Sequence, residues 1–266
     1  WDNVGGMVNR GVELNINAEV IRTKNFSWNI NANASYNRNK ITELYNGVNE
    51  YILSTSQTKL MVGHPVGEFF LTRFAGVNAA TGDPLWLTRD GEITSKYSDS
   101  DKVMTGKTFH APWQGGFGTT LSWKGLLLTA QFSWVADRWM VNNDRFFEEN
   151  SLFGGYNQSK RMLYDRWKKP GDITDIPRYG TTPQFDTHLL EDASFLRLKN
   201  LMLSYSLPKK LLARSGFLKN VRIYAQAQNL LTFTKFSGLD PESNLNIYAA
   251  EYPMSRQFTF GADFTF

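Results

Sequence analysis

The residues of this chain that could do acid–base chemistry are few and scattered. Its three histidines, His64, His110 and His188, lie far apart and form no HExxH pair. There is no GxSxG nucleophile elbow, no Walker A sequence and no cysteine, so thiol catalysis and Cys-based zinc sites are excluded. We therefore expect no catalytic residue, no metal ion and no cofactor, and we predict that the protein is not an enzyme.

Four aspartates could offer oxygen ligands to calcium, because they share a glycine-bearing stretch. The twelve-residue spacing of an EF-hand loop is absent, however. Aspartate is also frequent in turns, where its side chain accepts hydrogen bonds from nearby backbone amides, and we prefer that interpretation. The residues are Asp83, Asp90, Asp99 and Asp101.

Aromatic side chains are concentrated between residues 136 and 193. Trp139, Tyr156 and Trp167 are candidate contacts for a substrate or a partner, since Trp and Tyr dominate binding hot spots. Packing inside the segment is the alternative reading, and short helices are expected near residues 144–150 and 158–168. The 29 basic and 25 acidic residues are interspersed, so we expect no nucleic-acid partner.

The elements that must position these residues are strands, because polar and apolar residues alternate. From residue 26 to residue 36 the even positions are apolar and the odd positions are polar, which indicates a strand with two unlike environments. Residues 12–20 repeat the pattern, and a polar turn at 22–25 joins the two into a hairpin. The apolar row includes Trp28, Ile30 and Ala32. The polar rows include Asn15, Asn17, Asn29, Asn31 and Asn33.

The same alternation continues along the chain. A second hairpin spans residues 117–134 around a turn at 124–125, and a third spans 194–231, with a connection from Pro208 that holds one helical turn. The last strand places Phe258, Phe260 and Phe266 on one face.

Strand length and connection length predict a membrane barrel. The strands run to about 10–14 residues, against roughly 5–6 in globular sheets, and a tilted membrane strand needs about 9–11. Short turns alternate with long connections, as in outer-membrane barrels with periplasmic turns and extracellular loops. The fold class expected is therefore all-β, with seven spans of a transmembrane antiparallel β-barrel. In it the apolar rows would face lipid and the Asn rows the lumen. A soluble carbohydrate-binding β-sandwich and an outer-membrane barrel enzyme are the alternatives.

Two further segments carry expectations about their place in such a barrel. Residues 66–77 would break the parity of the spans, so we place them in an extracellular hairpin with residues 84–93. Arg197 and Lys199 fall on the outward row near the extracellular end of their strand. There they would pair with lipopolysaccharide phosphates or simply lie at headgroup level.

Several segments resemble the SusC/RagA family of TonB-dependent outer-membrane transporters of Bacteroidetes. The strongest are DASFLRLKNLMLSYSLP (192–208), RIYAQAQNLLTFTKFSGLDPE (222–242) and the closing YPMSRQFTFGADFTF (252–266). Weaker matches are NRGVELNINAEV, NASYNRNKI, VGHPVGEFF and KPGDITDIPRYG.

The resemblance implies a 22-stranded barrel in the outer membrane of a Gram-negative bacterium, filled by an N-terminal plug that TonB displaces. It also implies a SusD-like lipoprotein that closes the extracellular face over oligosaccharide or peptide cargo. Residues 1–266 would then be the C-terminal part of the barrel domain, surrounded by outer-membrane lipid and lipopolysaccharide. No plug and no TonB-contacting segment lies in this chain, so TonB would act through an N-terminal region that precedes it. The Asn rows would contact that plug or supply general lumen polarity.

Overall fold

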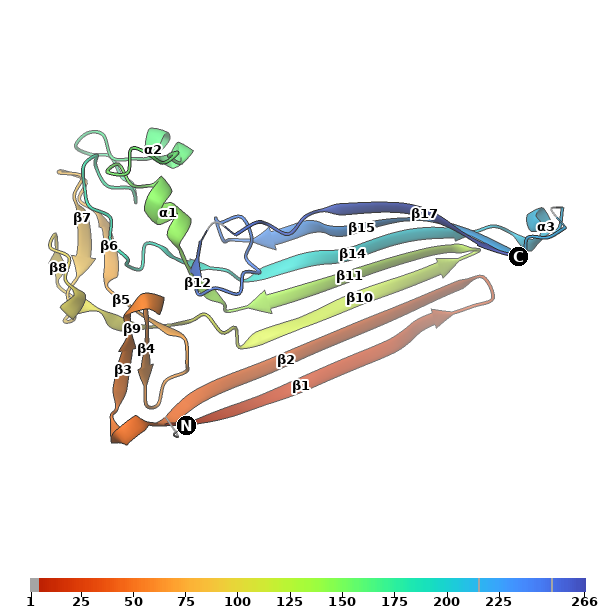
Figure 1. Ribbon diagram of the computed structural model, residues 1–266, viewed down its shortest axis with the longest axis horizontal. Coiled ribbons are helices and arrows are strands. Elements are labelled where there is room, and N and C mark those ends of the chain that lie inside the picture. The colour runs from red at the N-terminus through yellow and green to blue at the C-terminus, as the bar shows by residue number, and fades with distance from the viewer. Residues whose placement is uncertain (1–4, 215, 250) are drawn as a thin grey trace.

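Seven long strands form one antiparallel sheet in which they follow one another in chain order, with shorter strands lying in the connections between them (Figure 1). The computed structural model describes residues 5–214, 216–249 and 251–266. The sheet order is β1-β2-β10-β11-β14-β15-β17, which confirms the seven predicted spans. The strands are β1 (Gly5–Arg22), β2 (Phe26–Leu44), β10 (Trp113–Trp123), β11 (Leu126–Ala136), β14 (Phe195–Ser206), β15 (Asn220–Thr234) and β17 (Gln257–Thr265).

The register aligns the apolar rows on one face of this sheet. Ala32 of β2 lies opposite Ile16 of β1 and opposite Phe117 of β10. At the other edge, Ala225 of β15 lies opposite Phe260 of β17, whose side chain is 79% exposed. A β-sandwich would need a second sheet against these rows. Most side chains of these rows are exposed or half-buried, and the other sheets of the described residues are built from the long connections, so the sandwich alternative is wrong for this chain.

The opposite face of the sheet carries the polar rows. Asn15 pairs with Asn33 and Asn17 with Asn31 across β1 and β2, and Asn17 donates a hydrogen bond to Asn15 over 3.2 Å. The alternation of residue types therefore yields one apolar and one polar face, since successive side chains on a strand point to opposite sides. At the loop end of β1 and β2 the apolar row gives way to Arg10, Arg38 and Lys40.

The three short connections lie at the same end of the sheet as the C-terminus (Figure 1). Lys124 (φ 46°) and Gly125 (φ 92°) close the β10–β11 hairpin, because a two-residue turn that follows the strand twist needs positive φ at both positions. The β14–β15 connection contains α3 (Lys209–Leu212), the helical turn expected after Pro208.

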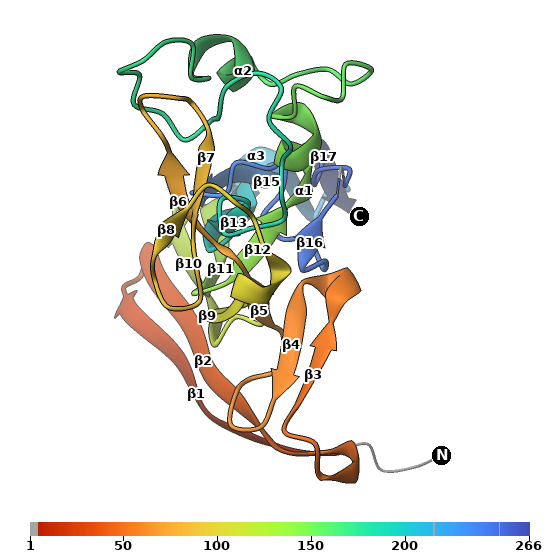
Figure 2. The same ribbon diagram turned by 90° about the vertical axis from the view of Figure 1, so that its left-hand side faces the viewer.

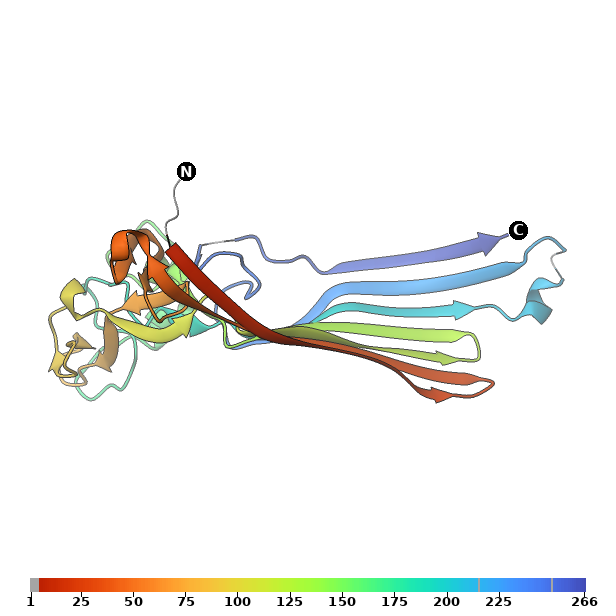
Figure 3. The same ribbon diagram turned by 90° about the horizontal axis from the view of Figure 1, so that it is seen from below.

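The three long connections gather at the other end of the sheet into what we call the loop assembly (Figures 2 and 3). None of its helices, nor any other helix in the described part of the chain, is long and apolar enough to span a membrane. Its strands are β3 (Glu50–Leu53), β4 (Thr58–Met61), β5 (Glu68–Leu71), β6 (Arg73–Val77), β7 (Pro84–Leu87), β8 (Ile93–Thr94), β9 (Val103–Thr108), β12 (Trp139–Asn142), β13 (Leu190–Asp192) and β16 (Ile247–Tyr248). Its helices are α1 (Asn143–Glu148) and α2 (Lys160–Tyr164), with 3-10 turns at Tyr45–Gly47, Ser54–Ser56 and Asp99–Asp101.

Residues 66–77 lie in the loop assembly and not in the seven-stranded sheet, as expected. Their second half, β6, forms the expected hairpin with β7. Their first half, β5, pairs instead with β4 and β9. The chain thus passes from one sheet to another at Thr72, between β5 and β6. The hairpin expectation was thus right for half of the segment.

The buried apolar core sits in the loop assembly. Phe69 and Leu71 of β5 pack with Val141 of β12 and with Leu189. A second cluster contains Met140, Ala193, Phe236 and Tyr248, which come from the second and third long connections. Burial of these side chains holds the three connections together as one body.

Candidate functional site

A pair of arginines fixes the third long connection over the polar face of the sheet. Arg197 of β14 is 2% exposed and donates to the carboxylates of Asp240 (2.5 Å) and Glu242 (2.8 Å). Arg138, which follows β11, donates to the carbonyl oxygens of Pro241 and Ser243. The segment 240–243 is therefore held by two arginines, one just after β11 and one on the neighbouring strand β14, and we call this arrangement the 240–243 clamp.

Hydrogen bonds within the clamp favour the charged form of Asp240. Burial alone would raise the pKa of Asp240, but hydrogen bonds from Arg197 and from the amides of Glu242 and Met254 hold that pKa below its usual value. Burial also lowers the pKa of Arg138, against the attraction of Glu242 and other nearby carboxylates. The clamp is a buried ion-pair cluster in which each carboxylate has a cationic donor.

The position of Arg197 corrects the expectation that it lies on the outward row. A register shift between β11 and β14 leaves Lys199 as an extra residue, so Leu198 and Leu201 share the apolar face and Arg197 lies opposite Ser133 on the polar face. Lys199 donates to Glu242 over 2.6 Å and so joins the same cluster. Both cations are therefore occupied by carboxylates of this chain, and the expectation that they meet lipopolysaccharide is wrong.

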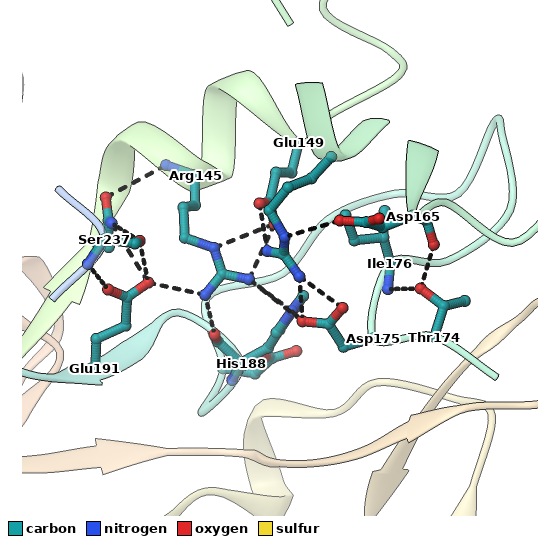
Figure 4. Close-up of polar contacts among 12 residues, drawn as sticks. Arg145, Glu149, Asp165, Thr174, Asp175, Ile176, His188, Glu191 and Ser237 are labelled. Carbon is teal, nitrogen blue, oxygen red and sulfur yellow. Dashed lines mark hydrogen bonds and ion pairs between the residues drawn. The ribbon is translucent and has the colours of Figure 1, made fainter. Parts of the chain in front are cut away.

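A second ion-pair network braces the loop assembly from within (Figure 4). Arg145 of α1 donates to Glu149 (3.0 Å) and to Glu191 of β13 (2.9 Å). Glu191 in turn accepts the backbone amide of Ser237 over 2.7 Å. The network thus ties the second long connection to the third. Although burial works to lower the pKa of Arg145, its two carboxylate partners raise it above the usual value.

His188 lies between a hydrogen-bond donor, Arg145, and an acceptor, Asp175, which contact the same ring nitrogen. Its Nε2 atom is 2.8 Å from the Arg145 guanidinium and 3.2 Å from the Asp175 carboxylate. A ring without a proton on Nε2 can accept from Arg145, and a ring that carries a proton on Nε2 can donate to Asp175, but one nitrogen cannot do both at once. Asp175 also accepts from Arg161 over 2.6 Å. The hydrogen bond from His188, followed by that from Arg161, lowers the pKa of Asp175 well below its usual value.

Two hollows adjoin these networks. The first lies beside the Arg145 network, with apolar walls from Phe74, Trp86 and Phe146 and a polar edge from Asp186 and His188. Burial raises the pKa of Asp186, although hydrogen bonds from Trp86 and from the His188 amide oppose the shift.

The second hollow lies where the polar face of the sheet meets the loop assembly. Its lining includes Asn37, Gln114, His110, Arg138 and Asn244. Amide side chains both donate and accept hydrogen bonds, so this hollow suits a polar chain with peptide or hydroxyl groups.

The structure does not bring the three candidate aromatic contacts together. Trp139 packs against the Phe69 cluster, under the ammonium group of Lys107 at 4.1 Å. Trp167 donates to the carbonyl oxygen of Ala79 over 3.0 Å, with its ring against Gly82. Both are packed within the loop assembly.

Tyr156 is the exposed member of the three. It contacts Phe147 and Phe153 at ring centroid distances of 5.4 and 5.9 Å, and its side chain faces solvent. Contact of any of these three residues with cargo stays a prediction.

Three of the four aspartates proposed as turn residues have identified partners, and Asp99 and Asp101 share one 3-10 turn. Asp83 pairs with Arg178 over 2.8 Å, and Asp99 with Lys102 over 2.9 Å. Asp101 accepts the amide of Arg89. In residues 5–214, 216–249 and 251–266, no group of three acidic or histidine side chains is placed to hold a metal ion.

The polar and apolar rows lie as the alternation indicates. Trp28, Ile30 and Ala32 share the apolar face with Phe258 and Phe260, and the five asparagines share the other. Phe266 lies just beyond β17 and stacks on Phe217 at 6.1 Å.

The charged residues of the two networks were missed by reasoning from the sequence. Arg145 and Glu149 have the i, i+4 spacing of a helical ion pair, which is the one local signal they carry. Arg138 and Glu191 meet partners between 40 and 110 residues away, so no local pattern marks them.

Known proteins similar to this chain are TonB-dependent receptors, although no family model matches it. TonB-dependent receptor P3 of Formosa agariphila is 27% identical over 299 residues, covering 99% of this chain and 29% of the relative. TonB-dependent receptor SusC of Bacteroides thetaiotaomicron is 28% identical over 283 residues, covering 99% and 27%. A solved structure of the RagAB peptide transporter superposes with a TM-score of 0.91 at 41% identity, covering 99% of this chain and 30% of that one. The chain thus spans less than a third of the length of these relatives.

Proposed function

Because this chain is of the SusC/RagA type of TonB-dependent outer-membrane receptors of Bacteroidetes, we propose that it forms the C-terminal part of the barrel of a nutrient importer. In this proposal the apolar face of the sheet meets lipid and the Asn rows face the lumen. A plug domain and a TonB-contacting segment would precede residue 1. The one observation that carries the proposal is the continuous sheet with one exposed apolar face and one polar face.

A SusD-like lipoprotein is the proposed partner at the loop assembly. The structural relative is described as the RagAB transporter, a name that pairs two components. The loop assembly supports this role because ion pairs and a buried core fix its shape in advance, so that binding costs little ordering of the surface.

We favour peptide over oligosaccharide as cargo. The relative with 41% identity is described as a peptide transporter, whereas the name of the SusC relative states no cargo. The hollow above the polar face supports peptide binding, because its amide side chains can pair with backbone N–H and C=O groups.

Uptake by intact cells tests the proposal. Cells with the full-length protein should take up a labelled peptide mixture, and uptake should stop when the gene, its SusD-like partner or TonB is deleted. Uptake of labelled oligosaccharide in place of peptide would keep the importer and reverse the cargo. Equal uptake of both labels with and without the gene would refute the importer.

Two tyrosines separate cargo contact from general loop function. Tyr156→Ala should weaken peptide uptake if Tyr156 touches cargo, while Tyr164→Ala, at another exposed tyrosine of the loop assembly, should leave uptake unchanged. Equal uptake by the two variants would assign Tyr156 to packing with Phe147 and Phe153.

A further inference from the structure

The three short connections of the sheet carry a concentration of positive charge. Together the segments 22–25, 124–125 and 207–219 contain seven Lys and Arg residues and no Asp or Glu, while the whole chain has a net charge of only +4. All of them are exposed, and we call them the turn-end cations. They are Arg22, Lys24, Lys124, Lys209, Lys210, Arg214 and Lys219.

The turn-end cations have few partners within the chain. Arg22 forms a loose ion pair with Glu19 at 3.4 Å. For the other six, no ion pair to a carboxylate occurs among the described residues. At the opposite end acidic residues are interspersed with the basic ones, and Arg145, Arg161, Arg178 and Arg197 pair with them. Other cations at that end, among them Arg10, Arg38 and Lys40, form no ion pair within the described residues. The contrast therefore lies in the lack of any acidic residue in the three short connections. The turn end therefore presents positive charge that the protein itself does not neutralise.

Large apolar side chains lie beside these cations. Trp123 ends the apolar row of β10, and Lys124 places its ammonium group 5.4 Å from the Trp123 ring. Phe217 and Phe266 stack on each other near Lys219, and both are exposed. Exposed aromatic rings directly next to unpaired cations are the arrangement expected where a protein surface passes from hydrocarbon to headgroups.

We propose that the turn-end cations bind the phosphate groups of anionic phospholipids in the membrane leaflet at this end of the sheet. This lipid-binding proposal rests on one part of the proposed function, namely that the sheet spans a membrane. The cations lie on connections of three successive hairpins across the sheet, so they form a line along its end. A line of cations at the edge of an apolar face would lie at the level of the lipid headgroups when that face contacts the hydrocarbon. Anionic headgroups attract such basic segments.

Lipid retention by the full-length protein tests this proposal. The protein is incubated in detergent with phosphatidylglycerol or phosphatidylethanolamine, and bound lipid is counted by native mass spectrometry. We expect phosphatidylglycerol to be retained preferentially. The variant with Lys124→Gln, Lys209→Gln, Lys210→Gln and Lys219→Gln should lose about tenfold or more in its affinity.

A control removes the same charge at the other end. Lys160→Gln, Lys168→Gln, Lys169→Gln and Lys235→Gln should change retention by less than about twofold, because these residues lie in the loop assembly. A gel-mobility shift on heating confirms that both variants fold as barrels. Equal retention by the two variants would overturn the proposal.

Competition identifies the bound chemistry. If an equal concentration of inorganic phosphate released the lipid, the site would be a general anion site and the lipid assignment would be overturned. Preferential binding of an acidic polypeptide over the lipid would overturn it as well. The assay needs neither cargo nor TonB, so a failure of peptide uptake leaves it unaffected. A protein that does not insert into bilayers would refute both proposals.

Discussion

Arg197 donates a hydrogen bond to Glu242 over 2.8 Å and so joins strand β14 to the connection that follows β15. Lys199, two residues further along β14, donates to the same carboxylate. The extra residue at the bulge is what turns Arg197 onto the polar face of the sheet. A one-residue irregularity in a strand thus decides where a long connection is held.

Replacing Arg197 should loosen that connection. Arg197→Met leaves Asp240 without its closest cation, and breaking a buried ion pair from one side costs about 3–5 kcal/mol. Hydrogen exchange of residues 235–249 should accelerate accordingly. Lys199→Met is the control, since Lys199 is more exposed and should cost about 1 kcal/mol or less. Similar exchange in the two variants would contradict the clamp.

The two faces of β2 should respond differently to a new charge. Ala32 lies in the apolar row, so Ala32→Arg should cost about 2–4 kcal/mol if that row faces the middle of a bilayer. Asn31→Arg, on the polar face opposite Asn17, should be nearly neutral. Unfolding in urea from lipid vesicles measures both. Equal costs would count against the proposed orientation of the sheet.

Gly115 of β10 should not tolerate a side chain. A Cβ atom there would approach the backbone oxygen of Asn33 to 2.3 Å and the ring of Trp134 to 2.8 Å. Gly115→Ala should therefore cost about 1–3 kcal/mol through overpacking. At Gly118 the added atom would meet the flexible side chain of Gln131, which can move, so Gly118→Ala should cost about 0.5 kcal/mol or less. The midpoint of urea unfolding distinguishes them.

Acid should weaken the loop assembly at His110. His110 is exposed at one side of its ring, and the partial loss of solvent on the other side, with a smaller effect of Arg138, holds its pKa below the usual 6.5. As pH falls below about 6.5, His110 takes up a proton in the unfolded chain but stays neutral in the folded chain. The free energy of unfolding therefore falls until the pH reaches the lower pKa of the folded state. Above pH 6.5 this residue contributes no pH dependence.

Hydrogen exchange of residues 103–112, corrected for intrinsic rates, checks this expectation at pH 8 and pH 5.5. His110→Gln should flatten the difference between the two pH values, because glutamine does not titrate. The same pH dependence in wild type and variant would assign it to another group.

The sequence by itself determined the sheet. Alternation has a period of two residues, and that period fixes which side chains share a face wherever the strand is regular. The rows from Val12 to Ala18 and from Phe258 to Phe264 therefore align in the structure as their spacing indicates. The positions of the short turns followed from the same pattern, since each lies where the alternation stops.

Only the tertiary structure decided the loop assembly and the side on which Arg197 lies. The bulge at Lys199 arises from pairing with both neighbouring strands, and a run of alternating residues does not reveal where one residue is skipped. Arg145 meets Glu191 across 46 residues of chain, and Arg138 meets Pro241 across 103. Such contacts depend on how three separate connections fold against one another. An ion pair constrains only the distance between two charges, so it produces no periodic pattern in the sequence.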